Sequence, residues 1–233
     1  MSPVNTQVSR AECLFIAKLA DESERWDDVI TQLKSIISFS NAQLTVEERN
    51  LLSVAYKNAT GTHRASWRTL DTLEKHQAQA HAPRREAALL RRAKERIERD
   101  IADACRDVLA LLERTLVPAA AAGEEKVFYK KMQGDYYRYL VECARRQQRE
   151  HYAQLSLEAY KGAYKHALGT LEPWHPTRLG LALNFAVYYR DVRGSPERAC
   201  HLAKHAFDEA VAAMWQMPEQ ACCAMICCCG RAR

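Results

Sequence analysis

Residues 47–58 read EERNLLSVAYKN, and they belong to a long helix that is predicted to run from Thr45 to about Ala78. Within this helix, Lys57 and Arg64 are seven positions apart. At about 3.6 residues per turn this separation is close to two turns, so both cations point to the same side of the helix, roughly 10 Å apart. Two fixed cations at that spacing favour the binding of an anion between them.

The composition predicts the same kind of structure for the rest of the chain. The sequence has 233 residues, of which 48% are hydrophobic, and only 8 are Gly and 7 are Pro. Scarce helix breakers and little strand-like alternation indicate long helices joined by short turns, and hence an all-α fold. Punctuation and periodicity predict nine segments: Ala11 to about Arg25, Asp27 to Ser38, Thr45 to Ala78, Arg84 to Leu116, Glu124 to Arg145, Gln148 to Leu168, Thr177 to Val192, Pro196 to Trp215, and a short one after Pro218.

Apolar stretches in this sequence are short. None reaches the ~20 residues that a membrane span needs, and the run Cys13–Ala17 is too short and too acidically flanked for a signal peptide. We therefore expect a soluble, cytoplasmic protein without a membrane span. The chain has 9 cysteines, and Cys13, Cys105, Cys143 and Cys200 lie in helical apolar patterns. A free thiol there behaves as a small buried hydrophobe, so we expect reduced cysteines.

The formal net charge is +5, and much of the excess lies between Arg84 and Arg99. Basic helices bind nucleic acid or anionic lipid through phosphates. The same stretch also carries acids at Glu86, Glu95 and Glu98, and mixed charge of this kind is typical of a solvated helix face. We favour the solvated face, and expect no nucleic-acid partner.

Two further stretches extend the pattern of residues 47–58. Residues 126–140 read KVFYKKMQGDYYRYL, and residues 178–185 read RLGLALNF. The three stretches, in this order, resemble the signature blocks of the 14-3-3 family, whose members are dimeric, all-helical readers of phosphoserine and phosphothreonine peptides. The resemblance extends from about Arg10 to about Glu219. It implies an antiparallel bundle of about nine helices that forms a concave groove, with a single domain at 1–219 and a divergent Cys-rich tail at 220–233.

The resemblance also implies a phosphopeptide site. A phosphate group carries about two charges and several acceptor oxygens, so its reader needs several fixed cations, preferably arginine forks. By resemblance, the phosphate pocket consists of Lys57, Arg64, Arg138 and Tyr139. The peptide groove is implied to contain Lys131, Asp135, Glu142, Gly180, Leu183, Asn184, Val187 and Asp191. Taken singly, these cations are typical of exposed helix charges and the apolar residues of a core; their joint occurrence in family order favours the site.

A dimer interface is implied as well, in which the first helices pack on the third and fourth helices of a second chain. The residues at interface positions are Leu19, Ser23, Arg25, Asp28, Leu70, Leu73, Arg96 and Asp100. Their charges are complementary, because Arg25 can pair with Asp100, and Asp28 with Arg96, across the two-fold axis. Ala93 stands where an aromatic residue is familiar in this interface.

The end of the chain departs from the family. The family's last helix supplies a second asparagine, a tryptophan and leucines to the groove, whereas residues 221–233 here read ACCAMICCCGRAR. A shortened groove wall leaves an alternative function open, namely a helical interaction scaffold that keeps the fold but has weakened or lost phosphopeptide binding. Acylation, soft-metal binding and an altered gene end remain open for the tail.

Motifs of catalysis do not occur in the sequence. It contains no Gly-rich phosphate loop, nucleophile elbow, His-Glu-x-x-His motif or pair of catalytic carboxylates. His201 and His205 have the spacing of metal ligands, but without a carboxylate at fixed spacing such a pair is typical of an exposed helix face. We expect a binding protein with no catalytic residue, cofactor or metal. Its expected partners are phosphorylated client proteins or peptides, together with a second copy or a related chain in a homodimer or heterodimer.

Overall fold

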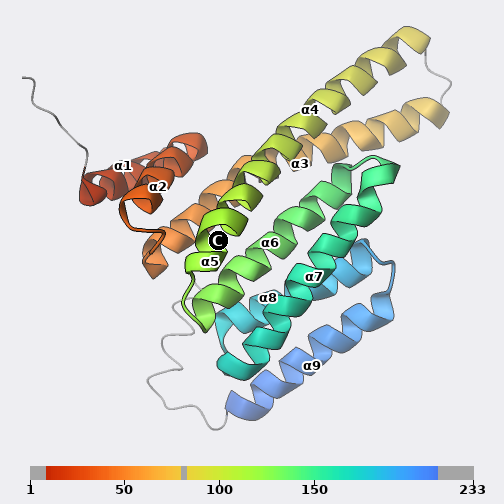
Figure 1. The fold of residues 1–233 in the computed structure, drawn as a ribbon. Helices are drawn as coiled ribbons and strands as arrows, with labels where there is room; N and C mark the ends of the chain where they lie inside the picture. Colours follow the sequence, from red (N-terminus) through yellow and green to blue (C-terminus); the bar gives the residue numbers. More distant parts are fainter. Residues whose placement is uncertain (1–8, 80–82, 215–233) are drawn as a thin grey trace, which may run out of the picture. The chain divides into compact units, whose positions relative to one another are not determined.

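The computed structural model describes residues 9–79 and 83–214, and this part of the chain contains helices and no strands (Figure 1). The long helices are α1 (Arg10–Glu22), α2 (Trp26–Phe39), α3 (Val46–Gln79), α4 (Arg84–Leu111), α6 (Glu124–Cys143), α7 (Arg146–Thr170), α8 (Pro176–Asp191) and α9 (Pro196–Met214), and a π-helical turn η1 (Leu112–Leu116) and a short α5 (Val117–Ala119) follow α4. The all-α prediction is confirmed. The predicted segment after Pro218 lies outside the described residues.

Contacts between elements divide the chain into two compact units, Met1–Ala120 and Ala121–Arg233. The first unit contains α1 to α5 with η1, and the second contains α6 to α9. A single domain at 1–219 with a tail at 220–233 stays a prediction.

In the first unit, α1 packs on α2, and an ion pair links it to the start of α3. Ser9 caps α1 in a capping box with Glu12, which satisfies backbone N–H groups at the start of the helix. Arg10 then reaches Glu48 at the start of α3, with 2.6 Å between Nη2 and Oε2. Glu48 is almost fully buried. Burial raises the pKa of Glu48, but the hydrogen bonds from Arg10 and Thr45 outweigh it, and the pKa lies below its usual value.

α3 and α4 form a long hairpin. At its base, α3 buries Leu52 and Tyr56, and α4 buries Cys105 and Val108. The Tyr56 hydroxyl donates to Asp107 Oδ2 over 2.6 Å, which gives the phenol a partner at the edge of the core. Burial and the Asp107 carboxylate together raise the pKa of Tyr56 above its usual value.

The second unit is an α-helical bundle in which α6 packs along α7, and α8 packs on α6, α7 and α9. Its core cluster includes Val127, Tyr160, Leu181, Phe185 and Tyr188, all buried. Aromatic rings contact one another in this core: the Tyr160 and Phe185 rings stack with centroids 5.3 Å apart. Such contacts contribute beyond the burial of apolar area.

Helix ends differ from the predicted ends by a few residues. α1 ends at Glu22 rather than near Arg25, because Glu24 adopts a left-handed conformation with φ of 55° and ends the helix. The fourth predicted helix was expected to end at Leu116, before Pro118, but helical structure continues to Ala119. Pro118 fits because it lies in the first turn of α5, where its missing N–H is not needed.

Candidate functional site

The candidate phosphate-binding residues lie on helices of both units. Lys57 and Arg64 are on α3 in the first unit, whereas Arg138 and Tyr139 are on α6 in the second. The peptide-groove residues all belong to the second unit: Lys131, Asp135 and Glu142 are on α6, and Gly180, Leu183, Asn184, Val187 and Asp191 are on α8. Contacts within the second unit join several of these side chains into one cluster.

Asp135 is the centre of this cluster. Its carboxylate accepts hydrogen bonds from Lys131 Nζ over 2.9 Å and from Asn184 Nδ2 over 2.8 and 3.0 Å. It also accepts one from the Tyr160 hydroxyl over 2.5 Å, and Arg138 Nη2 lies 3.5 Å from Oδ1. Asp135 is only 6% exposed, so its charge is compensated by protein groups rather than by water. These five residues are called the Asp135 cluster below.

The charges in the Asp135 cluster are set by mutual contact. Burial raises the pKa of Asp135, but the charges of Lys131 and Arg138 and the Tyr160 hydrogen bond lower it to a net value below the usual one. Burial and the Asp135 charge raise the pKa of Tyr160 well above its usual value. Burial opposes the charged form of Arg138, but the Tyr160 and Asp135 oxygens more than offset this and raise its pKa. The cluster therefore holds a carboxylate, a neutral phenol and a guanidinium.

Arg138 is oriented by three neighbours. Its Nε donates to the Tyr160 hydroxyl over 3.2 Å, and its Cζ lies 4.9 Å from the centroid of the Tyr139 ring. With the Asp135 contact, these interactions restrain a side chain that is only 13% exposed. A guanidinium held in this way loses little conformational entropy when it binds an anion.

Tyr160, on α7, is a member of the cluster that sequence reasoning did not select. A signal was present, because Ala153, Ser156, Tyr160, Ala163 and Ala167 are spaced by three or four residues and all are buried. A buried hydroxyl in such a stripe needs a hydrogen-bond partner. The partner is Asp135, which itself is 25 positions away in the sequence.

The surface of α8 beside the Asp135 cluster is partly exposed to solvent. Leu183 is 61% exposed and Val187, one turn further, is half-buried, so Leu183 is not a core residue. A Cβ atom at Gly180 would lie 3.8 Å from Lys131 Cε, which shows that α8 runs beside the Lys131 side chain. Asn184 uses its Nδ2 for Asp135, and no described residue donates to its Oδ1.

The last groove candidates lie at the ends of α6 and α8. Asp191 forms an ion pair with the neighbouring Arg190, with 2.6 Å between Nε and Oδ1. Glu142 is half-buried near the end of α6.

The two phosphate-pocket candidates on α3 differ in exposure. Lys57 is exposed and Arg64 is half-buried, while Tyr56 and Thr60 of the same helix are buried.

Comparison with known sequences identifies the family to which this chain belongs. The sequence model of the 14-3-3 proteins matches residues 16–226. The chain belongs to the 14-3-3 family. The checkpoint signal transducer rad24 of Schizosaccharomyces pombe is 47% identical over 212 residues, which cover 91% of this chain and 78% of that protein. A 14-3-3 protein homolog of Candida albicans is 48% identical over 211 residues, covering 91% and 79%, and protein BMH2 of Saccharomyces cerevisiae is 44% identical over 212 residues, covering 91% and 77%.

Family membership gives the coarse function. Proteins of the 14-3-3 family are adaptors that bind client proteins, and they are not enzymes. The Asp135 cluster agrees with a binding role, since its charged members hold one another in place.

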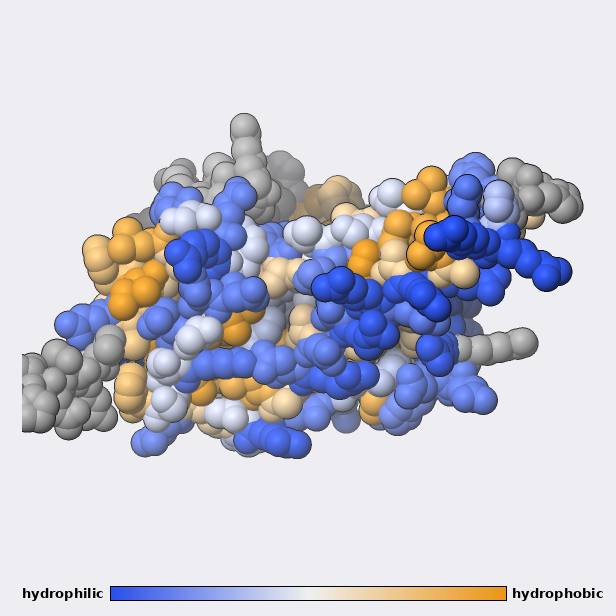
Figure 2. All heavy atoms as spheres, turned by 90° about the horizontal axis from the view of Figure 1, so that it is seen from above, coloured by the Kyte–Doolittle hydropathy of each residue, from blue (hydrophilic) through white to orange (hydrophobic). Residues whose placement is uncertain are grey.

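The interface candidates of this 14-3-3 chain lie in the first unit. Leu19 is 53% exposed and Leu73 is 46% exposed. On the face of the molecule drawn in Figure 2, hydrophobic residues reach the surface in separate patches between hydrophilic ones. Arg25 and Asp28 pair with each other within the chain, with 2.5 Å between Nη2 and Oδ2. The remaining candidates are Ser23, whose hydroxyl donates to the Leu19 carbonyl, half-buried Leu70, and exposed Arg96 and Asp100.

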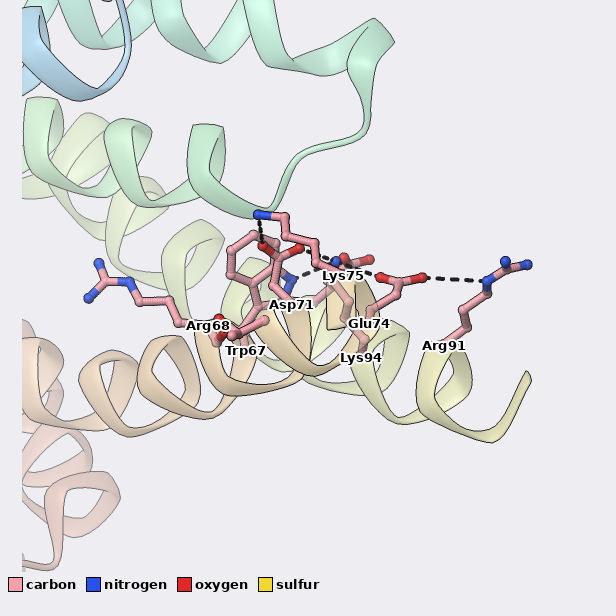
Figure 3. Close-up of polar contacts among 9 residues, drawn as sticks. Trp67, Arg68, Asp71, Glu74, Lys75, Arg91 and Lys94 are labelled. Carbon is pink, nitrogen blue, oxygen red and sulfur yellow. Dashed lines mark hydrogen bonds and ion pairs between the residues drawn. The ribbon is translucent and has the colours of Figure 1, made fainter. Parts of the chain in front are cut away.

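The basic stretch of α4 in this 14-3-3 chain is partly neutralised by its own hairpin (Figure 3). Lys94 Nζ lies 2.5 Å from Asp71 Oδ1 and 3.0 Å from Glu74 Oε2, both on α3, and 4.9 Å from the centroid of the Trp67 ring. Arg91 Nε lies 3.4 Å from Glu74. Two of the cations that the sequence placed on this stretch therefore have acidic partners on α3.

In residues 9–79 and 83–214, no three His, Cys, Asp or Glu side chains are grouped to hold a metal ion. Cys13, Cys105, Cys143 and Cys200 form no disulfide within the described residues. The Cys-rich tail lies outside these ranges. No described helix combines the length and the apolar character that crossing a membrane requires.

Proposed function

We propose that this 14-3-3 chain binds phosphoserine and phosphothreonine peptides of client proteins, and that Lys57, Arg64, Arg138 and Tyr139 contact the phosphate. The observation that carries the proposal is that Asp135 and Tyr160 contact the Arg138 guanidinium and restrain its position. A restrained guanidinium keeps N–H groups ready for two phosphate oxygens, which is the geometry that arginine forks use.

The charge of the Asp135 cluster supports an anionic ligand. Lys131 and Arg138 bring two positive charges and Asp135 brings one negative charge, so one positive charge is left over in a largely buried setting. A phosphate dianion gains more from such a centre than from an exposed one, because water screens it less. Lys57 and Arg64 would supply the remaining charge from α3.

The α8 side chains support an extended peptide beside the phosphate. Asn184 is oriented through its Nδ2, which leaves Oδ1 to accept a backbone N–H of the ligand. Exposed Leu183 and neighbouring Val187 would contact apolar side chains of the peptide, and Lys131 would line the polar side. We assign Glu142, Gly180 and Asp191 to the rest of the groove.

The proposal includes a dimer and a cytoplasmic location. Phe15, Ile16 and Leu19 are exposed on one helix, at 63%, 40% and 53%. Adjacent exposed apolar residues favour association of α1 with a second chain. Two linked grooves would hold a client with two phosphosites, which raises apparent affinity through effective concentration.

Fluorescence anisotropy tests phosphate reading directly. A labelled phosphoserine peptide with an upstream arginine is titrated beside its unphosphorylated twin. We expect only the phosphorylated peptide to bind. The Arg64→Ala/Arg138→Ala double variant should lower the affinity by well over about tenfold, since each charged hydrogen bond contributes about 1.5–3 kcal/mol.

Two further variants make this result specific. Lys57→Ala removes an exposed cation of the proposed pocket and should weaken binding without affecting the fold. Lys204→Ala removes an exposed cation of α9 that pairs with Asp208, and it should leave binding unchanged. Equal binding of both peptides, or none by a folded chain, would instead favour the alternative function, a helical scaffold that no longer depends on phosphate.

A further inference from the structure

A pocket lies between α7, α8 and α9 in the second unit. Its volume is about 360 Å³, and no member of the Asp135 cluster lines it. The lining residues are Tyr164 of α7, Tyr189 of α8, and Arg198, His201, Leu202 and His205 of α9. This volume is near the lower end of small-molecule sites, which occupy about 300–1,000 Å³.

Aromatic residues held by the core form one part of this pocket. Tyr164, Tyr189 and Leu202 are half-buried and pack against the core cluster. Phe185 stacks on Tyr189 with centroids 4.8 Å apart and meets Tyr164 edge-on at 6.2 Å. Because the core holds both phenol rings from behind, their positions are set before any ligand arrives. Rings fixed in this way favour stacking with a planar aromatic group.

Nitrogen donors on α9 form the other part. Arg198, His201 and His205 follow one another at spacings of three and four residues, so they lie along one face of the helix. The two imidazole rings are nearly parallel, with centroids 6.3 Å apart. Glu209 Oε2, 3.4 Å from His205 Nδ1, is also paired with Arg178. Arg198 has no hydrogen bond or ion pair with any residue in the described ranges, and its fork is open to a ligand.

We propose that this pocket binds a small aromatic phosphate, with the ring on Tyr164 and Tyr189 and the phosphate on Arg198 and His201. Two histidines without a third ligand do not form a metal site in the described chain. An open guanidinium beside the imidazole of His201 favours an anionic ligand. A phosphate monoester has three terminal oxygens, enough to accept two hydrogen bonds from the Arg198 fork and one from His201, whereas a carboxylate has two. The single ring fits the limited volume.

Two-dimensional ¹H–¹⁵N NMR of the full chain tests this site with phenyl phosphate as the probe. The amides of residues 198–205 should shift saturably. Cyclohexyl phosphate, which keeps the charge but cannot stack, should bind more weakly, and so should inorganic phosphate. Arg198→Ala should raise the Kd by about tenfold, as expected for loss of a charged hydrogen bond. Lys204→Ala removes a cation from the same helix outside the pocket and should leave the Kd unchanged.

An Arg138→Ala variant separates this pocket from the proposed phosphopeptide site. If the α9 shifts persist in that variant, the pocket binds the probe independently. If they disappear, or if Arg198→Ala leaves the Kd unchanged, the pocket is not a phosphate site, and the proposed phosphopeptide function is unaffected. Equal affinities for phenyl and inorganic phosphate would overturn the aromatic part of the proposal. Loss of phosphopeptide binding alone would leave the pocket standing.

Discussion

At the scale of single residues, Asp135 carries the candidate site. Asp135→Asn keeps the shape but removes the charge that faces Lys131 and Arg138. Breaking a buried ion pair in this way costs about 3–5 kcal/mol, and we expect a loss near the lower end because Asn still forms hydrogen bonds. Urea denaturation measures the change. Asp208→Asn, which breaks an exposed pair on α9, should cost less than about 1 kcal/mol; equal losses would show that Asp135 has no special role.

The same residue predicts a pH dependence. The pKa of Asp135 is lower in the folded chain than its unfolded value of about 3.9. Its contribution to stability is therefore fully present above the unfolded pKa and is lost as the pH falls through the folded pKa. We expect the difference in unfolding free energy between wild type and Asp135→Asn to be constant above about pH 5 and to shrink below about pH 4. Urea midpoints of both proteins between pH 7 and pH 3 check this, and a constant difference throughout would contradict it.

Sequence reasoning could select most of these residues but not their contacts. Asp135 and Asn184 were both expected in the peptide groove, but the sequence did not show that Asn184 donates to Asp135 from 49 positions away. Tyr160 was missed because its role depends on α6 lying against α7. Spacing along one helix shows which side chains share a face, but it does not show which residue of another helix they meet.

At the scale of helices, Gly134 allows α6 and α7 to approach. A Cβ atom at Gly134 would lie 2.7 Å from ring carbons of Tyr160. That ring is stacked on Phe185 and its hydroxyl is bonded to Asp135, so it cannot move aside cheaply. We expect Gly134→Ala to destabilise the chain by about 1–3 kcal/mol, the usual cost of overpacking. The measurement is the thermal midpoint.

Gly162 of α7 provides the matched control for Gly134. There a Cβ atom would first meet Lys130 Nζ at 3.5 Å, which is an ordinary contact with a flexible side chain. Gly162→Ala should therefore stabilise the helix, by up to about 1 kcal/mol. A loss of similar size in both variants would mean that helix geometry, and not the Tyr160 ring, sets the cost.

The α3–α4 hairpin depends on a different kind of contact. Lys94 is 15% exposed and bridges Asp71 and Glu74. Burial raises the pKa of Asp71, but hydrogen bonds and charge from Lys75 and Lys94 lower it to a net value below the usual one. Lys94→Met keeps the apolar stem but leaves the acids without this partner, and we expect a loss of about 1–2 kcal/mol in urea denaturation, from charged hydrogen bonds. Arg91→Met should cost less than about 1 kcal/mol, since Arg91 is 70% exposed. Equal costs would contradict a special role for Lys94.

Helix positions were predictable because each depends on local periodicity and few breakers. The described helices follow the predicted segments, with shifted ends where a special conformation intervenes. Glu24, with its positive φ, carries no sequence signal of the kind that a glycine gives. Pro118 was expected to stop a helix, but its position after the π-helical turn η1 makes it acceptable. These exceptions depend on backbone geometry that residue type alone does not specify.

At the scale of the whole molecule, the proposed function requires two groups of cations from different units. Lys57 and Arg64 belong to α3, and Arg138 belongs to α6. Helical periodicity shows which cations share a face of α3 and which share a face of α6. Only the resemblance to the family assigns both groups to one phosphate. The Arg64→Ala/Arg138→Ala variant removes one arginine from each group, and the two single variants measure what each group contributes to binding.

Association of two chains is the last prediction. Leu19 is 53% exposed on α1, beside exposed Phe15 and Ile16, and burying these side chains against a second copy would remove apolar area from water. Leu19→Asp would place a charge in that contact, and a buried unpaired charge is strongly unfavourable. In sedimentation velocity we expect wild type at about twice the chain mass of 26.6 kDa and Leu19→Asp at the mass of one chain.

Leu168→Asp, at a residue of α7 that is 48% exposed, makes the same change outside the proposed interface and should leave the dimer intact. A wild-type monomer, or a dimer that survives Leu19→Asp, would remove α1 from the interface. A dimer lost equally in both variants would point to general surface charge instead.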